Sequence, residues 1–384
     1  SFIVSNCIFP TANATSYFEG VHGNGATPPG GRAIIRDSFF GKFHSIRGNY
    51  NDALDFTGNN RPGAILQLYN NVFIGSDDDL IDLDGTDAWV EGNLFMHVHR
   101  VGSPDSASAI SGGSDNGQTS EITVVGNLFF DVDHAMTAKE GNFFTFLRNT
   151  VVDQNSRGSE DRLEDIAGQP DVFRPAVFNF ADAGTPAARG MYIEGNVIHS
   201  AEKLVRNYTG RELVTFNHNL FPEGMTWAGA GSGNSSADAL LNDVTVDPAT
   251  GVSTIPTPTK DNYREIARQI RGQFGLAARS PARGTGPNGT DQGGVRPFGV
   301  SLGGAPAGTT NATSATITVG PRFTGAGIPT GAAQFPNGSG WTHFRWRLDG
   351  GPWSAETPTA TPIALTGLAH GTHTLEVSGK NDAG

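Results

Sequence analysis

The sequence has a single cysteine, Cys7, among its 384 residues. One thiol excludes an intrachain disulfide, a CxxC metal site and a haem-attachment motif. No apolar run approaches the length of a membrane span. Basic residues are also scarce, with 26 Lys and Arg against 38 Asp and Glu. A net charge of −12 argues against a nucleic-acid partner, because phosphates are bound by basic surfaces.

Long amphipathic helical patterns are almost missing, whereas turn-forming residues are abundant, with 52 Gly and 22 Pro. This composition favours an all-β protein, and the length suits one large domain followed by a small one. The chain opens in mid-pattern with SFIVSNCIF and stops at KNDAG, without a visible signal peptide. We therefore expect both ends to be trimmed.

A short motif, a polar residue followed by two apolar residues, recurs along the first two-thirds of the chain. Its markers are Cys7, Ser38, Asn71, Asn93, Asn127, Asn149, Asn196 and Asn219. The shortest spacings are 22 residues, from position 71 to 93 and from 127 to 149. Short strands separated by Asn- or Gly-rich corners at this period predict a parallel β-solenoid. Asn suits the corner because it tolerates the left-handed conformation, and its amide can bond to the Asn of the next coil.

Stacking of coils turns equal offsets from the marker into columns about 4.8 Å apart. The second position past the marker is apolar throughout and predicts a core column. Its members are Phe9, Phe40, Phe73, Phe95, Phe129, Val151, Ile198 and Phe221.

With these repeats, and with the closing segment GLAARSPARGTGPNGTDQGG at 275–294, the sequence resembles right-handed parallel β-helix proteins of the pectate-lyase type. The resemblance covers residues 1–299 and concerns the fold. It implies an all-β, right-handed parallel β-helix. One amphipathic helix, near 261–274 with Asp261 as its N-cap, is expected to cover an open end of the solenoid.

Residues 300–384 begin with a Gly/Ala/Thr-rich linker and then contain short alternating segments such as THFRWRL and GTHTLEV. They resemble the immunoglobulin- or fibronectin-III-like modules of bacterial extracellular enzymes. We expect a small β-sandwich, truncated at its end, that serves as a spacer or attachment module.

The stretch GSDDDLIDLDGTD places six aspartates between Asp77 and Asp87. Two polar columns run through this region. The fourth position past the marker gives Lys42, Gly75, His97, Asp131 and Asp153, and the sixth gives His44, Asp77, His99, Asp133 and Asn155. The next strand adds a second polar face, formed by Asp55, Asp82, Asp84, Ser111, Thr137 and Lys139. If LIDLD and AMTAK align, Lys139 lies two coils above Asp84, about 10 Å away. These columns predict an acidic groove with Lys139 and Arg148 at its upper end.

Clustered carboxylates on rigid strands suit Ca²⁺, so Asp77, Asp79, Asp82 and Asp84 are the predicted metal ligands. The resemblance implies that such a metal neutralises a uronate carboxylate while a Lys or Arg removes the adjacent proton, which cleaves the sugar chain by β-elimination. Lys139 is the predicted base, and the remaining catalytic candidates are Arg148, Asp82 and His99. The substrate-binding candidates are His97, Asp131, Asp133 and Asp55. The expected partner is a polysaccharide or cell-surface glycan, and the expected location is secreted or at the cell surface.

Other interpretations stay open. The carboxylates would raise the lysine pKa, which opposes its role as a base. The sequence also lacks the RxPxxR motif and the NTD…DD…GHG…RIK signature of the polygalacturonase-like branch. Hydrolysis would use Asp82 with Asp55 or Asp84 as acid and base. A non-catalytic surface or adhesive protein, or a purely structural Ca²⁺ site, would need only solvated or metal-bound aspartates at solenoid corners.

Overall fold

A computed structural model gives the structure of the chain. It describes residues 2–14, 19–24, 32–45, 51–58, 65–99, 107–152, 176–180, 186–201, 203–245, 254–294, 300–306, 308–320 and 342–380. The described residues up to position 294 form one compact unit, and those from position 300 form a second.

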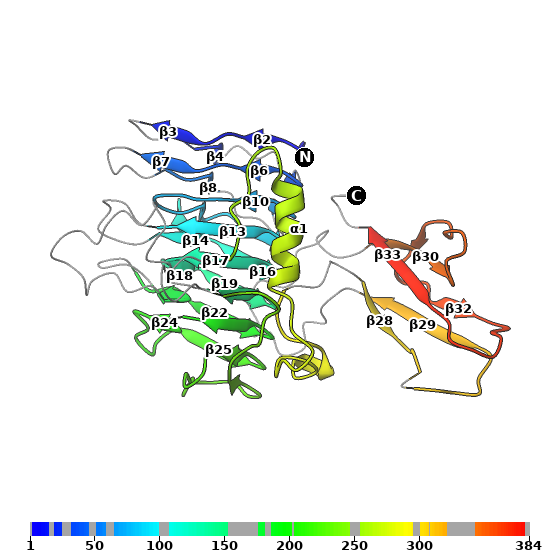
Figure 1. Cartoon of the computed structure of the whole chain (residues 1–384). Helices are drawn as coiled ribbons and strands as arrows, with labels where there is room; N and C mark the ends of the chain where they lie inside the picture. Colours follow the sequence, from blue (N-terminus) through cyan, green and yellow to red (C-terminus); the bar gives the residue numbers. More distant parts are fainter. Residues whose placement is uncertain are drawn as a thin grey trace. The chain divides into compact units, whose positions relative to one another are not determined.

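The first unit is a parallel β-helix built from three long parallel sheets, as the sequence predicted (Figure 1). Most coils contribute one strand to sheet A, then one to sheet B, then one to sheet C. Sheet A contains β1 (Phe2–Ser5), β5 (Ala33–Arg36), β9 (Leu66–Tyr69), β12 (Ala88–Glu91), β16 (Glu121–Val125), β19 (Phe143–Leu147), β22 (Gly190–Glu194) and β25 (Leu213–Asn217).

The other two sheets follow the same order along the molecule. Sheet B contains β2 (Ile8–Phe9), β6 (Phe39–Phe40), β10 (Val72–Phe73), β13 (Leu94–Val98), β17 (Leu128–Val132), β20 (Thr150–Val152), β23 (Val197–Ser200), β26 (Leu220–Phe221) and β27 (Ser235–Ser236). Sheet C contains β4 (Val21–Asn24), β8 (Leu54–Thr57), β11 (Ile81–Asp84), β14 (Ser108–Asp115), β18 (His134–Ala138), β21 (Phe178–Phe180) and β24 (Val205–Arg206). Beside them, β3 (Ala12–Ala14) pairs with β7 (Phe43–Ser45), and β15 (Gln118–Thr119) forms a hairpin with β14.

The corner between sheets A and B carries the predicted asparagine ladder. The side-chain amide of Asn93 donates to Asn127 Oδ1, and that of Asn127 donates to Asn149 Oδ1. The ladder runs from Asn71 to Asn234, a last member that the repeat analysis missed. The left-handed residue of each corner is the one before the marker, such as Asn70 with φ 53° or Gly126 with φ 61°. The marker Asn therefore serves as a hydrogen-bonding residue, and its neighbour makes the turn.

The predicted apolar column fills the interior of the coils. Phe40, Phe73, Phe95 and Phe129 are fully buried. Neighbouring rings lie nearly parallel, with centroids 4.5 Å apart for Phe40 and Phe73 and 5.0 Å apart for Phe95 and Phe129. In-register stacking places the same residue type at the same height in each coil, so one favourable contact is repeated along the axis.

Among the described residues, the single α-helix is α1 (Tyr263–Gln273), which lies along the outer face of sheet B and crosses several coils (Figure 1). This corrects the expectation that it covers an open end. Its buried residues, including Ile270 and Phe274, pack on outward-facing residues of sheet B such as Met96 and Phe130. It begins after Asn262, one residue beyond the predicted cap.

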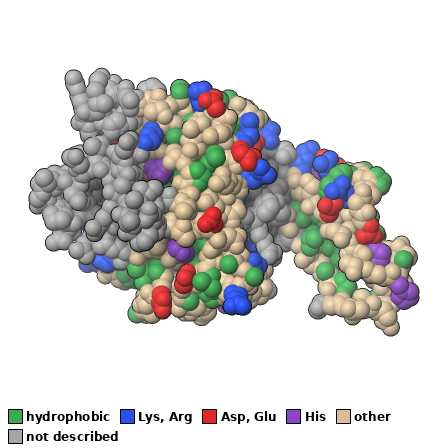
Figure 2. Space-filling view, viewed as in Figure 1, with side chains coloured by type: hydrophobic (Ala, Val, Ile, Leu, Met, Phe, Trp, Pro, Cys, Tyr) green, Lys and Arg blue, Asp and Glu red, His purple; other side chains and the backbone are tan. Residues whose placement is uncertain are grey.

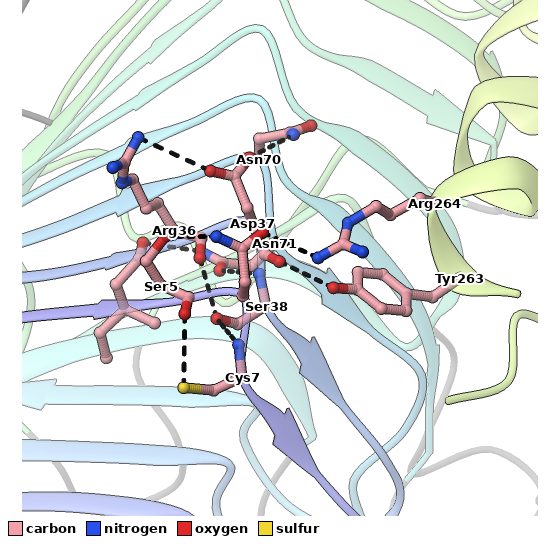
Figure 3. Close-up of polar contacts among 11 residues, drawn as sticks. Ser5, Cys7, Arg36, Asp37, Ser38, Asn70, Asn71, Tyr263 and Arg264 are labelled. Atoms are coloured by element: carbon pink, nitrogen blue, oxygen red, sulfur yellow. Dashed lines mark hydrogen bonds and ion pairs between the residues drawn. The ribbon is translucent and has the colours of Figure 1, made fainter. Parts of the chain in front are cut away.

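Polar contacts bind α1 to the ladder corner (Figure 3). The Tyr263 hydroxyl donates to the carbonyl of Asp37, and the Arg264 guanidinium donates to Asn6 Oδ1. At the other end, the Arg271 guanidinium donates to the carbonyl of Gly92. These contacts connect the helix to successive coils. A short 3-10 turn, η1 (Pro287–Gly289), follows in the closing segment.

The second unit contains two small antiparallel sheets, in agreement with the expected β-sandwich. One sheet is formed by β28 (Ser301–Gly303), β29 (Ala315–Gly320) and β32 (Ile363–Leu365), and the other by β31 (Thr357–Pro358), β30 (His343–Leu348) and β33 (Leu375–Lys380). Ile317, Phe344 and Ile363 are buried between them.

Charge alone does not mark a site on the face of the molecule that Figure 2 shows. On the face of the molecule in Figure 2, acidic and basic side chains of the described residues are interspersed. In the described part of the chain, no helix is long and apolar enough to span a membrane.

Candidate functional site

The outer face of sheet C carries a continuous column of polar side chains. Leu54 and Ile81 point into the core and are fully buried, so the residues that follow them face outward. The strand register places these outward residues beside one another across the sheet. In order they are His22, Asp55, Asp82, Ser111, Thr137, Asn179 and Arg206.

A second column, two residues further along the strands, joins Asp84 to Lys139. Asp84 is in register with Gly113, and the Lys139 amide donates to the carbonyl of Gly112 on the same strand. This is the alignment that the sequence suggested. Lys139 Nζ lies 3.7 Å from Asp84 Oδ1. A Cβ atom at Gly113 would collide with Asp84 Oδ1 and lie 3.0 Å from Lys139 Cε. Glycine at this position leaves the gap through which the lysine reaches the aspartate.

Further carboxylates lie on the segments that lead into these strands. Burial raises the pKa of Asp52 well above its usual value, and the charges of Asp78, Asp82, Asp79 and Asp55 raise it further. We call Asp52, Asp55, Asp78, Asp79, Asp82 and Asp84 the carboxylate cluster. Asp52 and Asp78 were not among the residues selected from the sequence.

A repeated spacing could have identified Asp52. Leu54 pairs with Ile81 in the sheet, so the residue two positions before each strand occupies the same place in its coil. DALD at 52–55 and DLID at 79–82 are thus the same acidic pattern in successive coils. The alignment on corner markers concealed this repeat because the corners before β8 and β11 differ in length.

The electrostatics of the cluster favour protonated carboxyls. Burial and then the charge of Asp82 raise the pKa of Asp84 to about 7, despite the opposing effect of Lys139. Burial and Asp82 likewise raise the pKa of Asp55 to about 6, although His22 Nδ1 lies 2.9 Å from its carboxylate. Burial alone would lower the pKa of Lys139, but Asp82, Asp84 and Asp79 outweigh it and raise that pKa above its ordinary value.

The residues fit a hard cation. Buried oxygens without a hydrogen-bond partner occur on several side chains of this face. They are Asp52 Oδ1, Asp55 Oδ1, Asp82 Oδ1, Asp84 Oδ1 and Ser111 Oγ. A buried oxygen that accepts no hydrogen bond destabilises the folded state. Ca²⁺ is bound by sets of oxygen ligands of this kind. Among the described residues of this face, the ligand atoms that lie within 4.8 Å of one another belong to Glu19, His22 and Asp55. A cation shared by Asp52, Asp78, Asp79 and Asp82 would draw these carboxylates closer together than they lie here.

The structure divides the predicted metal ligands. Asp79, Asp82 and Asp84 belong to the carboxylate cluster through their charges on Lys139. Asp77 is buried at the start of the preceding corner, where its amide donates to the carbonyl of Phe43.

The predicted His and Asp columns form a separate network at the corner that follows sheet B. His97 Nδ1 lies 2.9 Å from Asp131 Oδ2, and His99 Nδ1 lies 3.0 Å from Asp133 Oδ1. Burial would lower the pKa of His99, but Asp131 and Asp133 raise it to about 10. The same histidines hold the pKa of Asp131 well below its usual value, against the effect of burial. With 4% of the His99 side chain exposed, this network offers little surface to a polysaccharide.

Arg148 lies elsewhere, at the corner between sheets A and B, with φ 49°. Its guanidinium donates to Thr290 Oγ1 in the closing segment. Lys139, in contrast, follows sheet C. The structure therefore does not bring Arg148 to the upper end of a groove with Lys139, and it corrects that assignment.

Some predicted features fall outside the described residues. These are Asp153, Asn155 and the side chain of His44.

Comparison of the chain with protein-family models, with curated proteins and with solved structures finds no match. Function must therefore be inferred from the site itself.

Proposed function

We propose that this protein is a cation-dependent polysaccharide lyase that acts on a uronate-containing chain at the outer face of sheet C. The observation that carries the proposal is the combination of buried, unpartnered carboxylate oxygens with a lysine on one face. Asp52 and Asp82 each carry such an oxygen, and Lys139 is the lysine. A repeating outer face also suits an extended polymer, because each coil presents side chains at a regular spacing of about 4.8 Å.

The cation would neutralise the substrate carboxylate and thereby acidify the carbon-bound proton beside it. Lys139 is the group on this face that would accept that proton. A lysine acts as a base only when neutral, and the surrounding carboxylates keep this one protonated. The neutral fraction rises about tenfold for each pH unit below the pKa. Activity should therefore increase with pH through the neutral range and depend on the cation, which offsets the carboxylate charge.

The test is a screen of pectate, alginate and glycosaminoglycans, read by the ultraviolet absorbance of unsaturated products, each with Ca²⁺ and with chelator. Lys139→Arg keeps the positive charge but provides no base near neutral pH, so it should lower turnover by about 10²–10⁴-fold. Lys260→Met is the matched control, because this lysine is exposed and pairs only locally with Asp261. Activity that survives Lys139→Arg would contradict the proposal.

A glycoside hydrolase is the second candidate, favoured by the pKa of about 7 for Asp84. A carboxyl that is half protonated near neutral pH suits a general acid, and Asp82 lies two residues away on the same face, about 7 Å along the strand. New reducing ends without ultraviolet absorbance, lost in Asp84→Asn, would select this mechanism. Neither product from any glycan would leave a binding or adhesive role. A role on external polysaccharides would place the protein outside the cell or at its surface.

A further inference from the structure

The His97, His99 and Asp131 side chains converge at the corner that follows sheet B, away from the carboxylate cluster. We propose that these three residues, the histidine cluster, bind one first-row transition-metal ion, with Zn²⁺ as its occupant. This site is additional to the proposed Ca²⁺ site and would be structural.

Three potential ligand atoms lie close together, and two of their separations are near those of ligands around a tetrahedral ion. His97 Nδ1 and His99 Nε2 lie 2.9 Å and 3.1 Å from Asp131 Oδ2, and all three atoms lie within 4.8 Å of one another. Ligands at Zn²⁺ bond lengths of about 2.0–2.1 Å are separated by about 3.3 Å in a tetrahedron. The fourth position is available to water or to the second Asp131 oxygen.

His99 Nε2 is the atom that most needs an ion. It is buried, and it makes no hydrogen bond, because its contact with Asp131 lacks the required geometry. If Nδ1 carries the proton donated to Asp133, Nε2 presents a lone pair towards a carboxylate oxygen. Such an arrangement is repulsive until a cation lies between the two atoms.

The opposite ring nitrogens are held as they are in metal sites. His99 Nδ1 lies 3.0 Å from Asp133 Oδ1, and His97 Nε2 lies 3.1 Å from Thr257 Oγ1. Histidine ligands of metals commonly donate their second N–H to a carboxylate, a backbone carbonyl or water, which fixes the tautomer and the ring orientation. Asp133 is such a partner, and the Thr257 hydroxyl can accept in the same way. When the second N–H of each histidine is donated to these partners, the inner nitrogens are the ones that face the ion.

The backbone also adopts a special conformation here. His97 has φ 55° and Asp131 has φ 54°, on two adjacent strands. The left-handed conformation costs a non-glycine residue about 1 kcal/mol or more. The register resumes with Val98 opposite Val132, so the distortion is confined to the two residues that supply ligands. The ladder corners use the same left-handed conformation as an ordinary turn, so this backbone positions the ligands but does not by itself mark a site.

Nitrogen and oxygen ligands in a tetrahedral arrangement select Zn²⁺ over Ca²⁺, which takes oxygen. Because the His97, His99 and Asp131 side chains are 10%, 4% and 1% exposed, the site is closed to a polymer substrate. It joins two coils to the Thr257 segment, which leads into α1. The ion would therefore fasten that segment to sheet B.

The experiment measures metal in the purified whole chain and replaces it with Co²⁺. We expect about one zinc ion per chain by mass spectrometry, visible absorption bands of tetrahedral Co²⁺, and a thermal midpoint that rises with Zn²⁺ concentration. His97→Gln and His99→Gln should lose the Co²⁺ spectrum. Asp82→Asn, which removes a carboxylate from the other cluster, and His199→Gln should retain it.

Two results would overturn the proposal. Wild-type protein that binds no zinc and gives no tetrahedral Co²⁺ spectrum would show that the network is an ion pair with a doubly protonated His99. A spectrum lost in Asp82→Asn but kept in the histidine variants would assign the metal to the carboxylate cluster. Both readouts use wild-type protein first, so a variant that fails to fold does not decide the result. Neither depends on lyase activity.

Discussion

The ladder corner and the outer face of sheet C use buried polar side chains in opposite ways. At the ladder, fully buried residues such as Asn93 and Asn127 donate to and accept from their neighbours in adjacent coils. On sheet C, buried oxygens of Asp52 and Asp82 have no hydrogen-bond partner. One region repeats a single residue type, whereas the other changes residue from coil to coil.

The difference indicates which polar groups serve the fold and which are available to a ligand. A satisfied amide ladder rigidifies the solenoid, because each rung completes the one beside it. Ionised carboxylates in a row cannot hydrogen-bond to one another, because they only accept hydrogen bonds and their charges repel. The carboxylate cluster needs a cation, a proton or a substrate group.

Removal of one ladder rung should have the largest effect on stability. Asn127 Oδ1 accepts from the backbone and side-chain amides of Asn93, and its own amide donates to Asn149 Oδ1. Asn127→Ala would leave several buried groups unsatisfied and should lower the free energy of unfolding by about 3–5 kcal/mol. Urea unfolding of the wild type and of Asn127→Ala measures this difference in free energy.

Asn234→Ala is the matched control, because Asn234 is the partly buried last rung of the described ladder. It should cost clearly less than Asn127→Ala. Equal losses at the two positions would show that the rungs do not act cooperatively.

A variant at Asp87 tests the effect of burial without strong repulsion between carboxylates. Burial is the main cause that raises the pKa of Asp87 to about 7. A pKa raised in the folded state means that stability is full below the unfolded value, about 3.9, and decreases as pH rises towards 7. Asp87→Asn keeps an oxygen for the Glu121 amide and removes that decrease. It should raise the free energy of unfolding by about 1–3 kcal/mol above pH 7.

The measurement is urea unfolding between pH 4.5 and 8 for both proteins. The two curves should approach each other at the acid end. A constant difference across the range would mean that the effect of Asp87 is not electrostatic.

Asp82→Asn tests whether sheet C is designed for a cation. In chelator, the change should raise the free energy of unfolding by roughly 1 kcal/mol, because it removes one of several repelling charges. In Ca²⁺ it should abolish the increase in thermal midpoint shown by the wild type. Asp243→Asn, at an exposed carboxylate, is the control and should keep that increase. If Ca²⁺ raises the thermal midpoint of Asp82→Asn as much as that of the wild type, the cation does not bind at this face.

Arg148→Asn should have the smallest effect on activity, a change of less than about twofold. Asn tolerates the left-handed backbone at this position, and the residue lies at the ladder corner, where it contacts Thr290. Steady-state rates on the substrate found in the screen measure the effect. A loss as large as that of Lys139→Arg would restore Arg148 as a catalytic residue.

The fold was largely predictable because its repeat is local. The motif at Asn93 and Asn127 revealed the coil period, and the alternation in LIDLD gave the inward and outward faces of β11. Alignment on the strands also brought Lys139 into the column of Asp84. The position of α1 was not predictable, because an apolar stripe on a helix fits an open end and a sheet face equally well.

The candidate site was only partly predictable. Asp79, Asp82 and Asp84 were selected, but Asp52 and Asp78 were missed, because corners of unequal length shift the count from the marker. The histidines were placed in the same columns as Asp131 and Asp133, as the structure has them. The contact of His97 with Thr257 joins residues 160 positions apart, which spacing along the chain does not predict.

The sequence by itself determined the coil, the ladder and the phenylalanine column, because in-register stacking converts a linear spacing directly into a row of contacts. Only the tertiary structure decided which charges meet. Lys139 reaches Asp84 because Gly113 leaves a gap on the intervening coil, and Asp52 joins the cluster because β8 and β11 are in register. Electrostatic interactions depend on distances and burial across coils, which the spacing of residues along the chain does not specify.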